Sequence, residues 1–123
     1  MLNSSHVIAF VATTNADKAR AFYEGKLGLG LLEDNPFALV FDGNGVMVRV
    51  QKVQSLNPAA HTALGWNVSD IRGTVTALLQ KSVVFERYPR LSQDELGIWL
   101  SPSGAQVAWF KDPDGNVLSL TEF

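Results

Sequence analysis

The sequence contains the same order of predicted elements twice, and this repetition limits the folds that the chain can adopt. Each copy opens with a β-rich apolar segment, continues with apolar residues at helical spacing, and ends with several short apolar segments. The first copy spans about 5–55 and the second about 61–123. Because one such module leaves an apolar sheet face uncovered, we expect the two modules to pack together as a single α+β domain over 1–123.

The first copy has the order β-α-β-β-β. Asn15 is placed to cap its helix. Residues 42–45, Asp-Gly-Asn-Gly, predict a tight hairpin turn between the last two strands, since glycine and asparagine tolerate a positive φ. The strand, the helix and the three further strands are predicted over 6–12, 16–24, 29–33, 37–42 and 46–52.

The second copy repeats this order. Its helix is predicted over 70–81 with Ser69 as the cap, and with Ile71, Val75, Leu78 and Leu79 on one face. Proline and glycine predict turns at 101–104 and 112–115. The strands are predicted over 62–68 and near 83–88, 96–101, 105–111 and 116–121, and 96–101 and 105–111 read as one interrupted hairpin pair.

Composition excludes several classes of function. The chain has no cysteine, so it forms no disulfides, thiolate zinc sites or cysteine nucleophiles. The net charge of −2, with acidic and basic residues interspersed, disfavours nucleic acid and anionic membrane surfaces as partners. No apolar run approaches the roughly 20 residues of a membrane span. Residues 1–6 lack a secretory signal pattern, so we expect a cytoplasmic protein.

Three stretches carry a family resemblance: 6–11 followed by 19–24 and 27–29, then 64–70, and finally 110–118. Together with the doubled topology, they resemble the vicinal oxygen chelate superfamily. This superfamily includes glyoxalase I, extradiol dioxygenases and the fosfomycin- and bleomycin-resistance proteins. The resemblance implies cupped mixed sheets around a ligand cavity, with the helices outside.

The resemblance also implies four metal-ligand positions, on the first and last strand of each module. His6 occupies the position of the first-module histidine, and Gln51 is the best match to the second ligand. Ala63 and Ser119 stand where the second-module ligands belong. A divalent ion needs several nitrogen or carboxylate donors, so we expect no metal cofactor. The alternative is a divalent ion held by His6, Gln51 and His61.

The two histidines each have two interpretations. His6 is either a general base or hydrogen-bond donor in the cavity, since an imidazole titrates near neutrality, or an unused histidine near the cavity wall. His61 lies two residues before Ala63 and is expected on the same face of the strand. It stands either at the cavity mouth or in a solvated loop.

Alternation predicts that the valines of the strand near 46–52 pack beneath the helix. The intervening side chains then face the cavity: Met47, Arg49 and Gln51. A guanidinium there suits an anionic ligand, because it binds a carboxylate through two parallel hydrogen bonds. Alternatively, Arg49 extends along an edge strand into water. The neighbouring strand is expected to line the same concave face with Phe37, Leu39 and Phe41.

Tryptophans supply the other predicted lining. By alternation, Trp109 lies on the face opposite Ala108 and Phe110. It matches a position where the resemblance implies a cavity aromatic, and Trp99 lies on the preceding strand. A flat apolar ligand can stack on such rings, and the alternative for both is ordinary core packing. Trp66 is expected to pack beneath a helix.

These features favour a metal-free small-molecule binding protein that holds an aromatic or amphipathic ligand in the cupped cavity. Two enzymatic alternatives are open: a metal-dependent lyase, isomerase or dioxygenase of the glyoxalase type, and a metal-free enzyme with His6 as general base. Exposed strand edges and the resemblance predict a homodimer. The predicted ligand-binding residues are His6, Phe37, Leu39, Met47, Arg49, Gln51, Trp99, Trp109 and Ser119.

Overall fold

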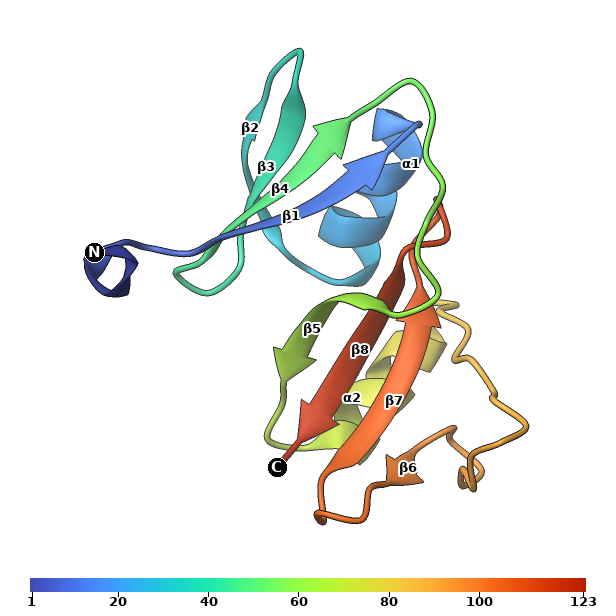
Figure 1. The fold of residues 1–123 in the computed structure, drawn as a ribbon. Helices are drawn as coiled ribbons and strands as arrows, with labels where there is room; N and C mark the ends of the chain where they lie inside the picture. The colour runs from blue at the N-terminus through green and yellow to red at the C-terminus, as the bar shows by residue number, and fades with distance from the viewer. The chain divides into compact units, whose positions relative to one another are not determined.

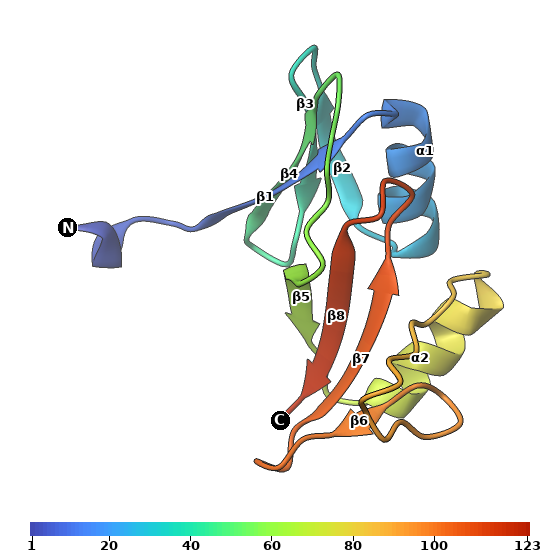
Figure 2. The ribbon, with the colours of Figure 1, turned by 45° about the vertical axis from the view of Figure 1, so that its right-hand side comes forward.

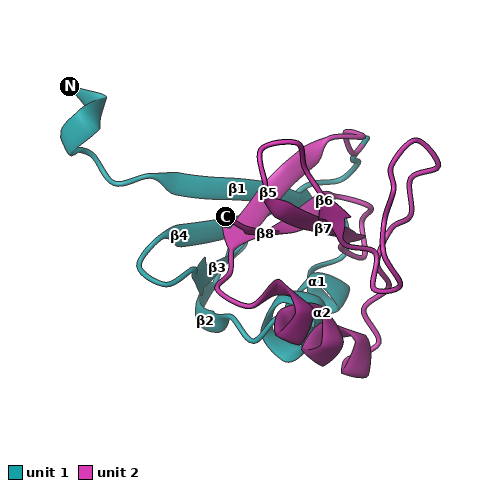
Figure 3. Cartoon of the chain, turned by 90° about the horizontal axis from the view of Figure 1, so that it is seen from below, with its two compact units in different colours: residues 1–57 teal, residues 58–123 magenta.

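The computed structural model describes residues 1–123, and the chain divides into two compact units over 1–57 and 58–123 (Figures 1 and 3). Each unit has the predicted β-α-β-β-β order, which confirms the doubled topology. Unit 1 contains η1 Leu2–Ser4, β1 Ile8–Thr13, α1 Ala16–Arg20, η2 Ala21–Lys26, β2 Gly30–Asp34, β3 Ala38–Asp42 and β4 Met47–Lys52. Unit 2 contains β5 Thr62–Asn67, α2 Ile71–Gln80, β6 Trp99–Leu100, β7 Gln106–Lys111 and β8 Val117–Glu122.

The two mixed sheets have the same internal order. The strands run β1-β4-β3-β2 in unit 1 and β5-β8-β7-β6 in unit 2. In each sheet the first strand pairs in parallel with the last, and the other pairs are antiparallel. Each helix covers one face of its own sheet (Figure 2). We call the opposite face of each sheet its helix-free face.

The first helix begins at the predicted residue, and the helical segment ends at Lys26, two residues beyond its predicted end. The Asn15 side chain accepts a hydrogen bond from the Lys18 backbone N–H at 3.1 Å, which confirms the cap. The helix continues without a break into the wider π-helical turn η2. Tyr23 in η2 is fully buried, and its ring lies 5.9 Å from that of Phe41 on β3. This contact fixes the helical segment to its sheet.

The predicted hairpin turn between β3 and β4 is confirmed. Asn44 and Gly45 both have positive φ, at 59° and 93°. The Gly43 N–H donates to the Val46 carbonyl at 2.7 Å, so Asn44 and Gly45 form a two-residue loop. This loop sets the register of the hairpin and places Phe41 opposite Val48.

The second helix begins one residue later than predicted. Asp70, and not Ser69, caps it by accepting a hydrogen bond from the Gly73 N–H at 3.0 Å. A carboxylate both accepts this bond and interacts favourably with the positive end of the helix. Ile71, Val75 and Leu78 are buried against the sheet, whereas Leu79 is 43% exposed. Neither this helix nor the first has the length and apolar character needed to cross a membrane.

The segment between α2 and β6 is the main departure from the prediction. The expected strand near 83–88 is reduced to an isolated bridge between Phe85 and Phe110. The expected strand 96–101 is reduced to the two residues of β6. We call residues 83–98 the connecting loop. The two predicted turns that follow are confirmed, because Gly104 donates to the Ser101 carbonyl and Gly115 to the Asp112 carbonyl, both at 3.0 Å.

Candidate ligand-binding site

The helix-free face of unit 2 presents two tryptophans. Trp109 pairs with Ser119, and Trp99 pairs with Val107, so these four residues share one face of the sheet. The indole rings of Trp99 and Trp109 lie 6.0 Å apart between centroids, with their planes at 35°. Both residues are only half-buried. The predicted position of Trp109 on the face opposite Phe110 is confirmed.

The opposite face of the same sheet holds the third tryptophan. Trp66 stacks on Phe110 with 6.4 Å between ring centroids, and Phe110 is fully buried beneath α2. The expectation that Trp66 packs on the helix side is therefore confirmed. The three tryptophans divide between a core face and a helix-free face.

The connecting loop adds two further residues to the tryptophan pair. The Tyr88 ring meets the Trp109 ring edge to face, with 5.4 Å between centroids and 85° between planes. The Arg90 guanidinium carbon lies 5.2 Å from the centroid of the Tyr88 ring, as in a cation–π contact. We call Tyr88, Arg90, Trp99 and Trp109 the aromatic cluster. It combines an extended aromatic surface with one cation.

A pocket of about 220 Å³ opens beside the aromatic cluster, and we call it the ring-lined pocket. Rings and aliphatic side chains form much of its wall, and a guanidinium, an imidazole and a hydroxyl supply polar groups. Polar and apolar atoms contribute almost equally to its lining, so the pocket offers a ligand both ring contacts and hydrogen-bond partners. The pocket is lined by Ala60, His61, Thr62, Tyr88, Arg90, Leu91, Trp109 and Val117.

Sequence reasoning missed Tyr88 and Arg90, and it left the place of His61 open. The structure places His61 in the wall of the ring-lined pocket, although the residue is itself exposed. The available signal for the other two was an aromatic residue between two arginines, interrupted by Pro89. Proline directly after the predicted strand near 83–88 favours a loop there, and loops frequently carry binding residues.

Gln93 shapes the connecting loop from within. Its side-chain oxygen accepts from the Tyr88 N–H at 2.7 Å, and its amide nitrogen donates to the carbonyls of Glu86 and Gly97 at 3.0 and 2.8 Å. Arg87 donates to the backbone carbonyls of Asp94 and Glu95 at 2.6 and 2.8 Å. These bonds replace a strand ladder and hold Tyr88 against Trp109.

Ion pairs join the connecting loop to α2, and we call their three residues, Arg72, Asp94 and Glu95, the clasp. Arg72 on α2 binds Asp94 at 2.9 Å and also binds Glu95. Partial burial works to raise the pKa of Asp94, but hydrogen bonds from the Ile98 and Leu96 N–H groups and from Arg72 outweigh it, and the pKa lies below its ordinary value. The hydrogen bond from Arg72 likewise lowers the pKa of Glu95. Both acids therefore stay ionised at neutral pH and keep the clasp closed.

Two of the five arginines lack an oxygen partner within the chain. Arg49 contacts only the sulfur of Met47, at 3.9 Å, and Arg90 contacts only the Tyr88 ring. Guanidinium groups that are not paired internally are available to carboxylates of a ligand. The remaining three bind carboxylates or carbonyls: Arg20, Arg72 and Arg87.

The predicted faces are confirmed for the residues of β4 in unit 1, but Val46, which precedes the strand, is 40% exposed and does not pack beneath the helix. Val48 and Val50 are buried, and Met47, Arg49 and Gln51 lie on the helix-free face. Phe10 on β1 pairs with Arg49 and adds an exposed ring to this face. The helix-free face of unit 1 therefore carries one cation among apolar side chains.

The expected orientation of β3 is wrong. Leu39 pairs with Val50 and Phe41 with Val48, so both lie on the helix-covered face and are fully buried. Ala38 and Val40 occupy the helix-free face instead. Phe37 precedes the strand and is 74% exposed. The two-residue turn at Asn44 and Gly45 causes this register, as described above.

The metal-ligand pair proposed for unit 1 is also wrong. Gln51 pairs with Ala12 of β1, whereas His6 precedes Ile8, the partner of Met47. The strand from Ile8 to Ala12 alone spans about 13 Å, and His6 lies two residues beyond it. Both ligands of one ion must lie about 2 Å from it. His6 and Gln51 therefore cannot bind the same ion.

The remaining histidine and carboxylate side chains are dispersed. No group of three or more histidine, aspartate or glutamate side chains lies close enough together to hold an ion. Ser119, at the position of the last expected ligand, is buried opposite Gly65, with its hydroxyl close to the glycine. A neutral hydroxyl at this position, with Ala63 at the other second-module position, does not fit the donor set that a divalent ion needs.

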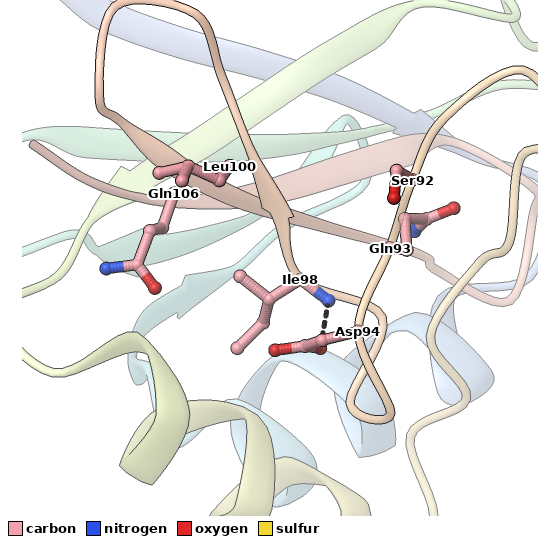
Figure 4. A pocket seen from close by; sticks show the side chains of 6 residues that line it. All are labelled: Ser92, Gln93, Asp94, Ile98, Leu100 and Gln106. Carbon is pink, nitrogen blue, oxygen red and sulfur yellow. Dashed lines mark hydrogen bonds between the residues drawn. The ribbon is translucent and has the colours of Figure 1, made fainter.

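A second pocket of about 490 Å³ lies beside the connecting loop and β6 (Figure 4). Asp94 supplies the one carboxylate of its lining. This carboxylate already has partners in the chain, because it accepts from the Ile98 N–H at 2.9 Å and binds Arg72. The Gln93 amide is similarly engaged by the loop backbone. This pocket offers a ligand fewer unpaired groups than the ring-lined pocket. It is lined by Ser92, Gln93, Asp94, Ile98, Leu100 and Gln106.

Solved structures with the same fold were found over nearly the whole chain. A crystal structure of a Bacillus anthracis protein placed in the glyoxalase family has a TM-score of 0.76 at 18% identity and covers 99% of this chain and 98% of its own. The bleomycin resistance determinant encoded on transposon Tn5 has a TM-score of 0.74 at 20% identity, with 97% and 98% covered. Lactoylglutathione lyase from Agrobacterium tumefaciens has a TM-score of 0.73 at 18% identity, with 96% and 93% covered.

These identities establish a shared fold and nothing finer. No match was found among the curated proteins. The family model of the Glyoxalase/Bleomycin resistance protein/Dioxygenase superfamily matches residues 4–120, nearly the entire sequence. The chain therefore belongs to the Glyoxalase/Bleomycin resistance protein/Dioxygenase superfamily.

Proposed function

We propose that the protein binds an aromatic small molecule in the ring-lined pocket, without a metal ion and without covalent chemistry. The observation that carries this proposal is the arrangement of Tyr88 and Trp109 beside a pocket on a helix-free sheet face. Structural neighbours of the same fold include both a lyase and a resistance determinant, so the fold alone does not choose between catalysis and binding. The choice between catalysis and binding therefore rests on the side chains of the site.

Size and chemistry of the pocket favour a ligand with one or two rings. Its volume of about 220 Å³ corresponds to roughly seven water molecules, each occupying about 30 Å³. The rings of Trp109 and Tyr88 are half-buried, and a bound ligand would shield more of their apolar surface from water. Such burial contributes roughly 25 cal/mol per Å². Stacked or edge-on contact between rings adds specificity of orientation.

The proposal that no metal takes part is supported by the donor set. His6 and Gln51 are too far apart along their strands to share an ion, and the second-module positions hold Ala63 and Ser119. No carboxylate lines the ring-lined pocket. A Lewis acid would therefore have no charged ligands beside the proposed binding surface.

We also propose that the protein forms a homodimer. The helix-free face of unit 1 exposes apolar side chains, with Ile8 46%, Phe10 55% and Met47 39% accessible. The strand β1 is an edge of its sheet. Exposed apolar faces beside an open strand edge are typical of protein interfaces. A second copy of the chain would cover this face.

A titration of metal-defined protein tests the proposed function. Protein purified without chelator would be analysed for zinc, nickel, manganese and iron, and then titrated with 2-naphthol before and after dialysis against EDTA. We expect much less than one metal ion per chain and the same affinity in both samples. Stoichiometric metal together with binding or turnover that EDTA abolishes would favour the metal-dependent enzyme instead. Turnover of a candidate substrate that the His6→Ala variant loses would favour the metal-free enzyme.

A further inference from the structure

We infer that Arg90 makes the ring-lined pocket selective for aromatic ligands that carry a carboxylate. This inference rests on the proposed function and narrows its ligand class from aromatic compounds in general to aromatic anions. It is carried by three observations: the unpaired state of Arg90, the absence of acidic side chains around it, and its attachment to the ring surface.

The guanidinium of Arg90 has no hydrogen-bond acceptor in the chain. Its one contact is the Tyr88 ring, 5.2 Å from the guanidinium carbon. A cation–π contact uses no acceptor oxygen, so the N–H groups of this guanidinium remain able to donate to a ligand. A carboxylate accepts two such donors in parallel, which fixes both its distance and its orientation.

The charge around the pocket is one-sided. The lining includes Arg90 and contains no aspartate or glutamate. The acids of the connecting loop are committed elsewhere, because Asp94 and Glu95 both bind Arg72 on α2. The chain as a whole is slightly acidic, at a net charge of −2, so an anion would be attracted here by a local cation and not by the overall field.

The Tyr88 ring couples the cation to the aromatic surface. It lies 5.2 Å from the Arg90 guanidinium carbon and meets Trp109 edge to face, with 5.4 Å between centroids. A ligand whose ring packs on Trp109 would therefore have its anionic group within the neighbourhood of Arg90. This arrangement fits a planar ring with a carboxylate attached directly to it.

Arg49 provides a matched control. It is the other arginine without an oxygen partner, but it lies on β4 of unit 1 and contacts Met47. It does not line the ring-lined pocket. If any unpaired guanidinium of this chain served equally well, replacing Arg49 would have the same effect as replacing Arg90.

Calorimetric titrations with a charged probe and its neutral isostere test the inference. The probes are 2-naphthoate and 2-naphthamide, and the proteins are the full-length wild type, Arg90→Gln and Arg49→Gln. We expect the wild type and Arg49→Gln to bind naphthoate about tenfold more tightly than naphthamide, the strength of one hydrogen bond to a charged group. Arg90→Gln should bind both probes with the affinity that the wild type has for naphthamide. Raising the salt concentration should weaken only naphthoate binding to proteins that retain Arg90.

The outcomes separate this inference from the proposed function. Equal affinity of the wild type for both probes, or a preference that survives in Arg90→Gln, would overturn the role of Arg90 and leave aromatic binding intact. A preference lost in Arg49→Gln would overturn it as well. If neither probe binds the wild type, the proposed function and this inference fail together. Arg90 is exposed, so its replacement should leave the far-ultraviolet circular dichroism and the urea midpoint of the folded protein unchanged.

Discussion

Tyr88 meets Trp109 edge to face, with 5.4 Å between their ring centroids and 85° between their planes. This contact joins the connecting loop to strand β7, two segments that share few backbone bonds. The Glu86 N–H donates to the Trp109 carbonyl at 2.8 Å, and Phe85 bridges to Phe110. The ring contact therefore determines where the loop, and Arg90 with it, lies on the helix-free face.

Replacing Tyr88 by alanine should lower both stability and ligand affinity. The loss of a half-buried ring and its edge-to-face contact is expected to reduce the free energy of unfolding by about 1–2 kcal/mol, measured by urea denaturation. The hydroxyl has no hydrogen-bond partner, so Tyr88→Phe should be close to the wild type. If Tyr88→Phe were as unstable as Tyr88→Ala, the ring contact would not be the cause.

Gly65 and Ser119 should behave as a coupled pair. They are partners across β5 and β8, and a Cβ on Gly65 would lie 2.7 Å from the Ser119 Oγ. Gly65→Ala should therefore cost about 1 kcal/mol, because the buried hydroxyl must move into a tightly packed environment. Adding Ser119→Ala should recover most of this loss, since it removes the atom in conflict. A double variant whose loss equals the sum of the two single losses would contradict this explanation.

The clasp between Arg72 and the loop acids should make stability depend on pH in the acid range. The pKa values of Asp94 and Glu95 are lowered, so the folded state binds protons more weakly than the unfolded state. Their contribution is complete above the ordinary carboxyl pKa of about 4 and is lost as the pH falls through the lowered values. The free energy of unfolding of the wild type, measured against pH, should fall in this acid range.

The matching variant is Asp94→Asn combined with Glu95→Gln, in which neither side chain titrates. It should be less stable than the wild type at pH 7, and its stability should change less with pH in the acid range. Parallel pH profiles for the two proteins would show that the clasp does not contribute through its charges.

The proposed dimer should depend on the helix-free face of unit 1. We expect the wild type to sediment as a dimer at micromolar concentration and the Phe10→Lys variant to sediment as a monomer, because a second cation beside Arg49 would be buried without a partner. Val84 is a matched control, since it is 74% exposed on unit 2, and Val84→Lys should remain dimeric. A monomeric wild type at this concentration would contradict the proposal.

Much of the fold was predictable because its elements carry local signals. Asn15 and the turn at Asn44 and Gly45 are side-chain and backbone preferences that act within a few residues. Strand β7 alternates between core and helix-free faces, so Trp109 could be placed before the structure was known. The superfamily followed from the combination of such segments over nearly the whole chain.

The orientation of β3 shows where alternation fails. Residues 38–41 are all buried, so the strand lacks the polar positions that would distinguish its two faces. The missing information was in the turn. A two-residue loop at Asn44 and Gly45 pairs Gly43 with Val46, and counting outward from that pair places Phe41 opposite Val48.

Tyr88 and Arg90 could not be placed from the sequence for a different reason. Their loop is held by bonds between single side chains and the backbone, above all those of Gln93 and Arg87. Such bonds join residues at irregular spacings and leave no periodic pattern in the sequence. The same segment has apolar and β-branched residues at 83–85, which imitated a strand.

The central claim is that a ligand binds on the aromatic cluster without a metal ion, and the three tryptophans allow a direct test. In a ¹H–¹⁵N correlation spectrum, protein in EDTA would be titrated with 2-naphthoate while the three indole N–H signals are followed, with Trp→Phe variants used to assign them. We predict a saturable shift for Trp109, which lines the ring-lined pocket, and an unchanged signal for Trp66, which stacks on Phe110 on the opposite face of the sheet. Shifts confined to Trp66, or shifts that appear only after a divalent ion is added, would contradict the claim.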